Sequence, residues 1–173
     1  MKIGIVGHGA EKFTTKSSIE AKDVITDIIR GAFGFSDLTI VSGHSPMKGV
    51  DFWAEELAKT WNIKTLICAP DKDHMHWVCP GCDGILEKRL ECDSKNIVLL
   101  FGYKLRNIAI AKESDILHVI LVDKLPPNYK GMKFEKCYHC NSTEHVKSGA
   151  CWTAKIAKKL GKEVIYHIIK QEE

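Results

Sequence analysis

Short apolar runs alternate with segments of helical periodicity along most of this chain. The runs cover residues 3–6, 38–41, 65–69, 116–122 and 164–169. Apolar runs of this length are typical of strands that are buried on both faces, as in a parallel sheet. The alternation therefore predicts an α/β fold in which helices connect successive parallel strands.

Four segments between these runs carry apolar side chains at helical spacing. The first begins at a predicted capping box, with Ser17 as the N-cap and Glu20 three residues later. The other three begin at Asp51, Arg106 and Cys151. We expect a Rossmann-like parallel sheet of about five strands with helices on both faces.

Two cysteine-bearing stretches, residues 71–95 and 123–147, lack this periodicity. No linker or low-complexity tract separates them from the rest, so residues 1–173 are predicted to form a single domain that carries both as insertions. The apolar run 96–101 fits either a strand or a helix.

Four of the seven cysteines form two Cys-x-x-Cys pairs, one in each insertion. Seven cysteines cannot all pair in internal disulfides, and this spacing in a reducing compartment is typical of metal ligands. Each insertion follows a predicted parallel strand, so both begin at the same edge of the sheet. The two cysteine pairs can therefore meet around one tetrahedral ion. A structural zinc that staples the insertions is the main expectation, with iron as the other candidate metal. Its predicted ligands are Cys79, Cys82, Cys137 and Cys140.

Other roles for these cysteines stay open. Redox chemistry and free buried thiols are the alternatives to metal binding. Cys68 lies in a predicted strand, where packing is the simpler role. Cys151 lies where a glycine-containing loop meets a predicted helix, so it could contact a ligand there, although packing is the simpler role. Side chains in the insertions that can replace a thiolate ligand are His74, His76, Cys92, His139 and His145.

The charge balance limits the partners of this chain. Lys+Arg is 25 and Asp+Glu is 22, which gives a net charge of +3 with neutral histidine. A dedicated nucleic-acid binder is usually more basic, so nucleic acid is not the favoured partner. No apolar run is long enough for a membrane helix. Glycines at positions 4 and 7 come too early in the chain for the apolar region of a signal peptide. We expect a cytoplasmic protein with no membrane partner.

Three glycine-containing loops, at 7–9, 42–49 and 148–150, follow a predicted strand or open a predicted helix. Ligands of doubly wound sheets bind beyond the carboxyl ends of the strands, where helix N-termini attract anions. Each glycine alone could simply form a tight turn, but three such loops on one edge favour a phosphate-bearing ligand. The chain lacks the P-loop and G-x-G-x-x-G sequences, which argues against those nucleotide-binding classes.

Three segments at these positions resemble motifs of the SLOG superfamily. Residues 40–51 (IVSGHSPMKGVD) resemble its VSGgAxGxD motif, Arg106-Asn107 resembles its RN segment, and residues 148–155 (SGACWTAK) resemble its SG…TA segment. The superfamily includes DNA-processing protein A (DprA), YspA- and YpsA-like proteins and Lonely Guy (LOG) phosphoribohydrolases. The resemblance implies a Rossmann-like fold that binds a nucleotide or nucleotide-derived ligand, in a chain that can form a homodimer.

The resemblance also implies which residues line the pocket. These are Gly43, Gly49, Arg106, Asn107, Ser148, Gly149 and Thr153. The loops themselves add Gly7, His8 and His44 as candidate ligand contacts. Arg106 can clamp a phosphate with two hydrogen bonds, and His44 can transfer a proton near neutral pH. Asp51 is expected to cap its own helix.

One departure from the superfamily bears on catalysis. LOG-type hydrolases carry a PGGxGTxxE motif whose glutamate assists cleavage of a ribosyl bond, whereas Ile156 stands three residues after Thr153 here. Glu55, Glu56 and Glu113 are candidate substitutes, although a solvated position on a helix face is the simpler interpretation of each. Binding that serves to sense, sequester or carry the ligand is therefore favoured over N-glycosidic or phosphate hydrolysis. DprA-like binding of single-stranded DNA is the third alternative.

Overall fold

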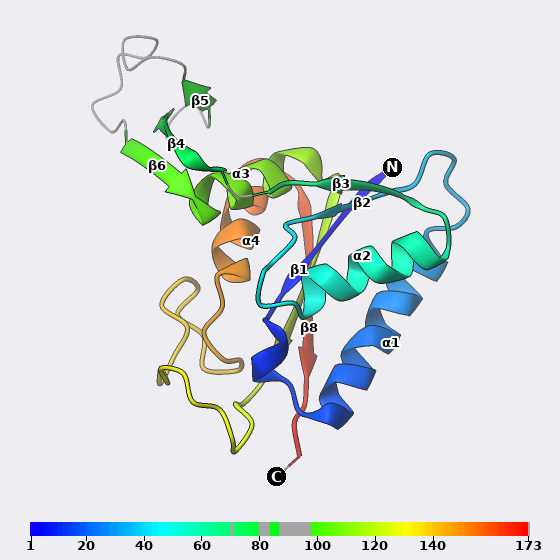
Figure 1. Cartoon of the computed structure of the whole chain (residues 1–173), viewed down its shortest axis with the longest axis vertical. Helices are drawn as coiled ribbons and strands as arrows, with labels where there is room; N and C mark the ends of the chain where they lie inside the picture. The colour runs from blue at the N-terminus through cyan, green and yellow to red at the C-terminus, as the bar shows by residue number, and fades with distance from the viewer. Residues whose placement is uncertain (70, 80–83, 87–97, 173) are drawn as a thin grey trace.

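The computed structural model describes residues 1–69, 71–79, 84–86 and 98–172, and between 71 and 101 it gives only the backbone of the strands. Helices cover one main sheet, and a small second sheet projects from the body (Figure 1). Within the described ranges, no helix has the length and apolar character needed to span a bilayer.

The main sheet has five parallel strands, which confirms the predicted fold class. Its strands are β1 (Lys2–Gly7), β2 (Thr39–Ser42), β3 (Lys64–Ile67), β7 (Ile116–Val122) and β8 (Glu163–Ile169). Their order is β3-β2-β1-β7-β8, and every neighbouring pair is parallel. The chain extends the sheet from β1 in one direction and from β7 in the other. The carboxyl ends of these two strands therefore form the switch point at which such folds bind ligands.

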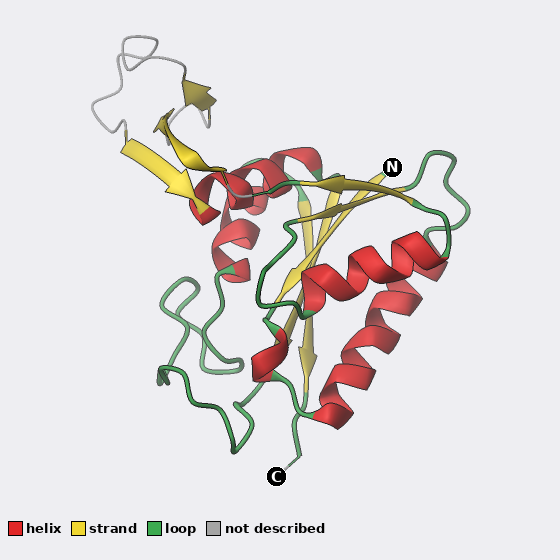
Figure 2. Cartoon of the chain, in the orientation of Figure 1, coloured by secondary structure: helices red, strands yellow, loops and turns green. Residues whose placement is uncertain are grey.

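Both faces of the main sheet are covered by helices, also as predicted (Figure 2). α1 (Thr15–Gly31) and α2 (Val50–Thr60) contribute to the core on one face. α3 (Tyr103–Glu113) and α4 (Ala150–Lys159) contribute to the core on the other face. The two helix pairs thus bring different side chains to the same carboxyl edge of the sheet.

Strand β7 shows how alternation builds the two cores. Leu117, Val119 and Leu121 are fully buried on the α3/α4 side. Ile120 and Val122 are fully buried on the α1/α2 side. Burial of each such side chain contributes about 1.5–3 kcal/mol relative to exposure. A one-residue slip of this strand would exchange the two sets, so its register is strongly fixed.

Helix α1 begins earlier than the sequence predicts. Its N-cap is Thr14, whose Oγ1 accepts a hydrogen bond from the Ser17 N–H at 3.1 Å. Ser17 Oγ accepts the Thr14 N–H at 2.9 Å and donates to Gln171 Oε1 at 2.7 Å. The capping box is therefore Thr14–Ser17 rather than Ser17–Glu20. A buried partner near the C-terminus holds the Ser17 hydroxyl, and the sequence pattern cannot reveal that partner.

Part of the first insertion forms a second sheet with the strand that follows it. β4 (Asp71–Cys79), β5 (Gly84–Leu86) and β6 (Val98–Gly102) are antiparallel in the order β5-β4-β6. The apolar run 96–101, which fitted either a strand or a helix, contributes to β6. Because β6 leads directly into α3, this sheet is inserted between β3 and the helix that begins the return to β7.

Candidate functional site

The loop between β7 and α4 brings four metal-binding side chains together. The donor atoms of Cys137, Cys140, His145 and Cys151 all lie within 4.8 Å of one another. His145 Nε2 lies 3.2 Å from Cys140 Sγ and 3.7 Å from Cys151 Sγ. Around tetrahedral zinc, Zn–S bonds of about 2.3 Å place ligand atoms about 3.8 Å apart. The set has the number, chemistry and spacing of a metal centre.

Local backbone geometry places the first two cysteines. The N–H groups of Cys140 and Asn141 donate to Cys137 O at 3.3 and 2.6 Å, and the Cys137 N–H donates to Ser142 O at 2.9 Å. Asn141 has a left-handed φ of 61°, which asparagine adopts more readily than most residues. The resulting tight turn holds Cys137 and Cys140 beside the same ion position.

His145 is oriented by a hydrogen bond on the side away from the sulfurs. Its Nδ1 donates to Val146 O at 2.8 Å, which leaves Nε2 as the donor atom toward a metal. A backbone carbonyl is a common outer partner of histidine ligands because it fixes the ring and its tautomer. His145 is buried, so this arrangement is sheltered from water.

Cys151 supplies the fourth donor from the first turn of α4. Burial raises the pKa of this thiol, and the neighbouring Cys137 and Cys140 sulfurs raise it further. A bound dication reverses both effects because it compensates the negative charge of the thiolates. The donor set therefore suits a cation better than three free thiols.

The structure bears on each predicted metal ligand in a different way. It places Cys137 and Cys140 in the cluster, together with His145, which was named as a substitute ligand. Cys82 lies outside the described residues, and Cys79 ends β4, whose side chains are not described. Cys151 was assigned to packing and instead has its sulfur in the cluster. The spacing Cys-x2-Cys-x4-His-x5-Cys within one segment was the signal for this set.

His8 connects the metal loop to the switch point. Its Nδ1 accepts the Val122 N–H at 3.1 Å, and its Nε2 donates to Val146 O at 3.2 Å. Burial lowers its pKa to about 3, so the ring is neutral. Both ring nitrogens are therefore occupied by the backbone. The His8 side chain therefore holds the segment around Val146 against the end of β7. The sequence had suggested His8 as a ligand contact, but its ring nitrogens already have these backbone partners.

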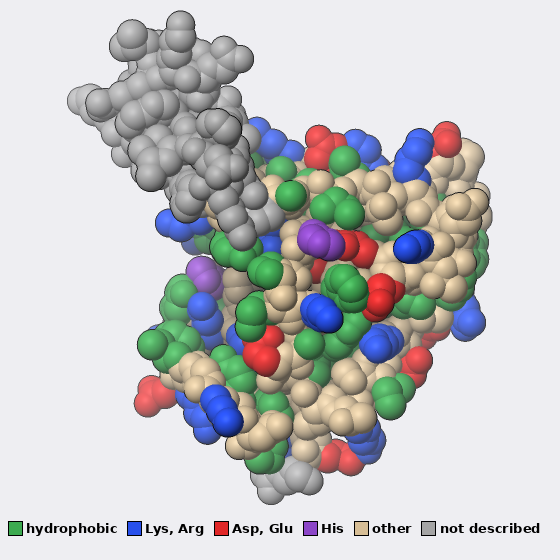
Figure 3. All heavy atoms as spheres, in the orientation of Figure 1, with side chains coloured by type: hydrophobic (Ala, Val, Ile, Leu, Met, Phe, Trp, Pro, Cys, Tyr) green, Lys and Arg blue, Asp and Glu red, His purple; other side chains and the backbone are tan. Residues whose placement is uncertain are grey.

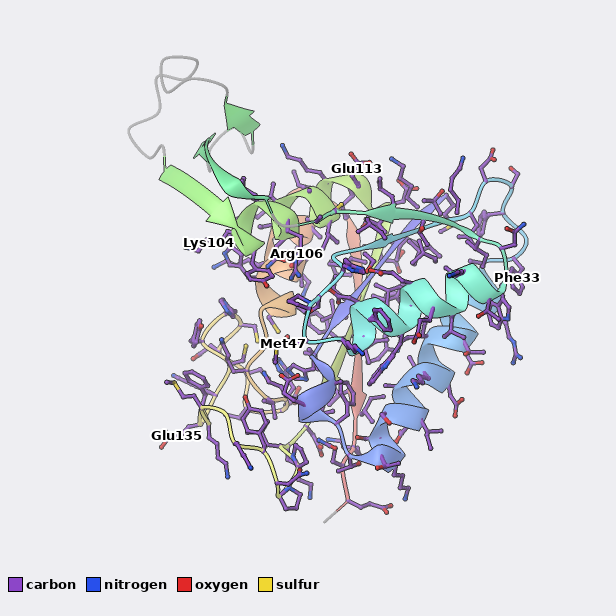
Figure 4. All side chains as sticks on the ribbon, viewed as in Figure 1. Phe33, Met47, Lys104, Arg106, Glu113 and Glu135 are labelled. Atoms are coloured by element: carbon purple, nitrogen blue, oxygen red, sulfur yellow. The ribbon has the colours of Figure 1, made fainter. Side chains whose placement is uncertain are left out.

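Arg106 and Gly43 meet at the carboxyl end of β2. Arg106 Nη1 lies 3.4 Å from Gly43 O, and Nε and Nη2 donate to Asn107 Oδ1 at 3.1 and 3.0 Å. A Cβ on Gly43 would lie 3.0 Å from Arg106 Cδ and from Asp51 Oδ2. Figure 4 shows Arg106 near the start of α3, beside the loop that carries Met47. Three predicted pocket residues, Gly43, Arg106 and Asn107, are thus brought together.

Asp51 is the buried anion beside this arginine. Its Oδ2 lies 4.0 Å from Arg106 Nη1. Burial raises the pKa of Asp51 to about 6, although Arg106 acts in the opposite direction. The N-cap of α2 is Gly49, and no side chain caps this helix, so the expectation that Asp51 caps it is wrong.

His44 and Glu55 form a second pair at the same strand end. His44 Nδ1 lies 2.7 Å from Glu55 Oε2. Glu55 Oε1 accepts hydrogen bonds from Ser42 Oγ at 2.6 Å and from the His44 N–H at 3.1 Å. The carboxylate is buried, whereas the His44 side chain is 56% exposed and its Nδ1 is the ring atom beside the carboxylate. Glu55 is therefore not the solvated helix-face carboxylate that the sequence suggested.

Gly7 and Gly49 have packing roles in this structure. Gly49 has a φ of +86°, and a Cβ there would lie 2.5 Å from His8 O and 2.6 Å from Ala10 N. A Cβ on Gly7 would lie 2.2 Å from Ile120 O. Gly49 thus allows the segment before α2 to approach the loop after β1 closely, and Gly7 allows the end of β1 to approach β7.

The remaining predicted pocket residues lie at the start of α4. Ser148 and Thr153 are buried, and Ser148 Oγ accepts the Ala150 N–H at 3.2 Å. Gly149 is the N-cap and has open space around its Cα. Since Cys151 belongs to the same turn, this helix start lies beside the metal cluster.

No protein-family model, curated protein or solved structure matches this chain.

Proposed function

We propose that the carboxyl edge of the main sheet binds a nucleotide or nucleotide-derived anion. The observation that carries this proposal is the position of Arg106, whose guanidinium lies at the end of β2 against Gly43, where no side chain intervenes. A guanidinium at this position can exchange its two hydrogen bonds to Asn107 Oδ1 for two hydrogen bonds to a phosphate. The superfamily resemblance and the position of the switch point support the same ligand class.

The test is a titration of the protein with a panel of ribonucleotides by isothermal titration calorimetry. Arg106→Ala should weaken binding of the best ligand at least about tenfold, because a charge-assisted pair of hydrogen bonds is lost. Arg106→Lys should restore only part of the affinity, since lysine lacks the planar fork. Lys104→Ala, an exposed cation on the same helix, is the matched control. Equal affinity of Arg106→Ala and wild type would refute the proposal.

The metal centre has a structural role in this proposal. Cys137, Cys140, His145 and Cys151 would hold one zinc ion with all four positions closed by protein, as in structural sites. When bound, zinc supplies a fixed positive charge and the free energy that orders the loop. Three reduced cysteines are consistent with a cytoplasmic location. X-ray absorption at the metal edge of the purified protein would distinguish zinc from iron.

Hydrolysis is a second candidate function because of the His44–Glu55 pair. A buried carboxylate that orients an exposed imidazole is the arrangement of a general base. In that reaction His44 Nε2 would take a proton from water, and the water oxygen would form a bond to the anomeric carbon of the ribose. The N-glycosidic bond would break, and the nucleobase would leave with the bonding electrons and take up a proton. Release of free base from nucleoside monophosphates, lost in both His44→Gln and Glu55→Gln, would favour this candidate. No release above that of the variants would exclude it.

A further inference from the structure

The loop between β7 and α4 exposes large apolar side chains that neither core covers. Met132, Tyr138 and Phe134 are 75%, 57% and 42% exposed. The Phe134 and Tyr138 rings lie 5.7 Å apart at 69°, and Lys147 Nζ lies 5.3 and 4.9 Å from their centroids. Aromatic side chains gathered at a soluble surface mark a site for a partner. We call this site the lysine–aromatic surface, which comprises Met132, Lys133, Phe134, Lys136, Tyr138 and Lys147.

The loop between β7 and α4 carries most of the net positive charge of the protein. Residues 123–149 contain five lysines, one aspartate and two glutamates, so their net charge (5 − 3) is +2 of the +3 of the whole chain. The low total charge therefore conceals a local excess of lysine in this loop. Figure 3 shows lysines beside hydrophobic side chains on the lower left, where Figure 1 draws this loop in yellow.

The metal cluster fixes how these side chains are presented. Tyr138 lies between two donors of the cluster, Cys137 and Cys140, and Lys147 follows His145 by two residues. Lys12 Nζ also donates to Lys147 O at 2.8 Å, which ties the loop end to the segment after β1. A surface held in this way loses little conformational entropy when a partner binds.

We propose that the lysine–aromatic surface binds single-stranded nucleic acid. Bases would stack on Tyr138 and Phe134, and phosphates would pair with lysines that alternate with these rings along the chain. Phe134 and Tyr138 stand in an irregular loop, which offers neither a helix nor a β-ribbon for a duplex groove. Unpaired bases, whose faces are open, are therefore the favoured substrate. This surface is separate from the Arg106 pocket, so the two proposals can fail independently.

The experiment measures fluorescence anisotropy of labelled twelve-residue oligo(dT) and oligo(rU) with the metal-containing protein at several salt concentrations. Tyr138→Ala should weaken binding about tenfold, as loss of one stacked base does, whereas Tyr138→Phe should retain it. Lys133→Ala should reduce the slope of log K against log salt by about 0.7, as expected for one lost phosphate contact on a single strand. Phe33→Ala, an equally exposed aromatic outside this loop, should have no effect.

Several outcomes would overturn the proposal. These are absence of oligonucleotide binding, equal affinity for a duplex of the same length, and unchanged affinity in both Tyr138→Ala and Phe134→Ala. Binding to phosphatidylserine vesicles without binding to oligonucleotides would assign the surface to membranes instead. Metal content of each variant must equal that of wild type, and Phe134→Ala provides a variant outside the metal ligands if Tyr138→Ala loses its metal. Arg106→Ala should bind the oligonucleotides normally.

Discussion

His8 and His145 donate to the same backbone oxygen. Val146 O accepts His145 Nδ1 at 2.8 Å and His8 Nε2 at 3.2 Å. The Val146 N–H in turn donates to Val122 O at 2.9 Å, at the end of β7. The backbone of one residue, Val146, therefore links a side chain of the Cys/His cluster to the switch point of the sheet. Loss of the metal and loss of His8 should both affect this junction.

The first prediction concerns which cysteines bind the metal. Native mass spectrometry of wild type should show one metal ion per chain, lost in Cys151→Ser because the fourth donor is removed. Cys68→Ser, outside the cluster, should retain the ion. Cys79→Ser and Cys82→Ser should retain it too, because Cys137, Cys140, His145 and Cys151 supply four donors without them. Loss of metal in Cys79→Ser with retention in Cys151→Ser would contradict this ligand set and support the one predicted from the sequence, in which the two Cys-x-x-Cys motifs bind one ion.

Removal of the metal should destabilise the folded chain. In our proposal a metal bound at the Cys/His cluster orders a long loop, and the binding free energy of a structural metal is stabilisation free energy. We expect a chelator to lower the unfolding temperature of wild type by at least about 5 °C in differential scanning calorimetry. The same chelator should leave Cys151→Ser unchanged. Equal shifts in both proteins would mean that the chelator acts elsewhere.

His8→Phe should weaken the fold without removing a metal ligand. The substitution leaves the Val122 N–H without its buried partner and removes one of the two hydrogen bonds to Val146 O, which costs about 1–3 kcal/mol in free energy of unfolding. Urea denaturation measures this loss, and metal content should stay at the wild-type value. A free energy of unfolding equal to that of wild type would show that water replaces both hydrogen bonds.

Two glycines implied in ligand binding should respond differently to alanine. Gly49→Ala forces a side chain into a φ of +86° and to 2.5 Å from His8 O, so it should destabilise by several kcal/mol, about the cost of strain plus displaced backbone. Gly149→Ala meets nothing within 4 Å and should leave stability unchanged. Thermal unfolding of both variants checks this contrast, and equal unfolding temperatures would contradict it. Because Gly149→Ala stays folded, its nucleotide affinity then tests the ligand role directly.

Stability should also depend on pH through a histidine pair on β7 and β8. His118 Nδ1 lies 2.9 Å from His167 Nε2, and the rings stack at 5.2 Å. Burial and the neighbouring His167 lower the pKa of His118 to about 4, and burial lowers that of His167. A lowered pKa means that the unfolded chain binds more protons. The contribution to stability is therefore complete above about pH 6.5 and is lost as pH falls from there toward 4.

The measurement for this pair is urea denaturation between pH 4.5 and 7.5. The double variant His118→Gln/His167→Gln should show a shallower loss of stability on acidification than wild type, because glutamine does not titrate. Parallel curves for the two proteins would place the pH dependence elsewhere.

The sequence by itself determined the sheet. Strand β7 coincides with the predicted run 116–122, because its apolar run is long and its register is fixed by burial on both faces. The Cys-x-x-Cys spacing likewise indicated a metal centre at Cys137 and Cys140, since a tight turn is a local property. Helix α1 was displaced by three residues because the Ser17 hydroxyl finds its partner in Gln171, far along the chain.

Only the tertiary structure decided which side chains complete the sites. Cys151 lies on a helix whose periodicity assigns it to the core, and its sulfur joins the cluster only because the preceding loop folds back on α4. Glu55 is buried and paired because the loop after β2 turns His44 onto it at 2.7 Å. Periodicity records which face of an element is buried, whereas these contacts depend on how separate elements meet in space.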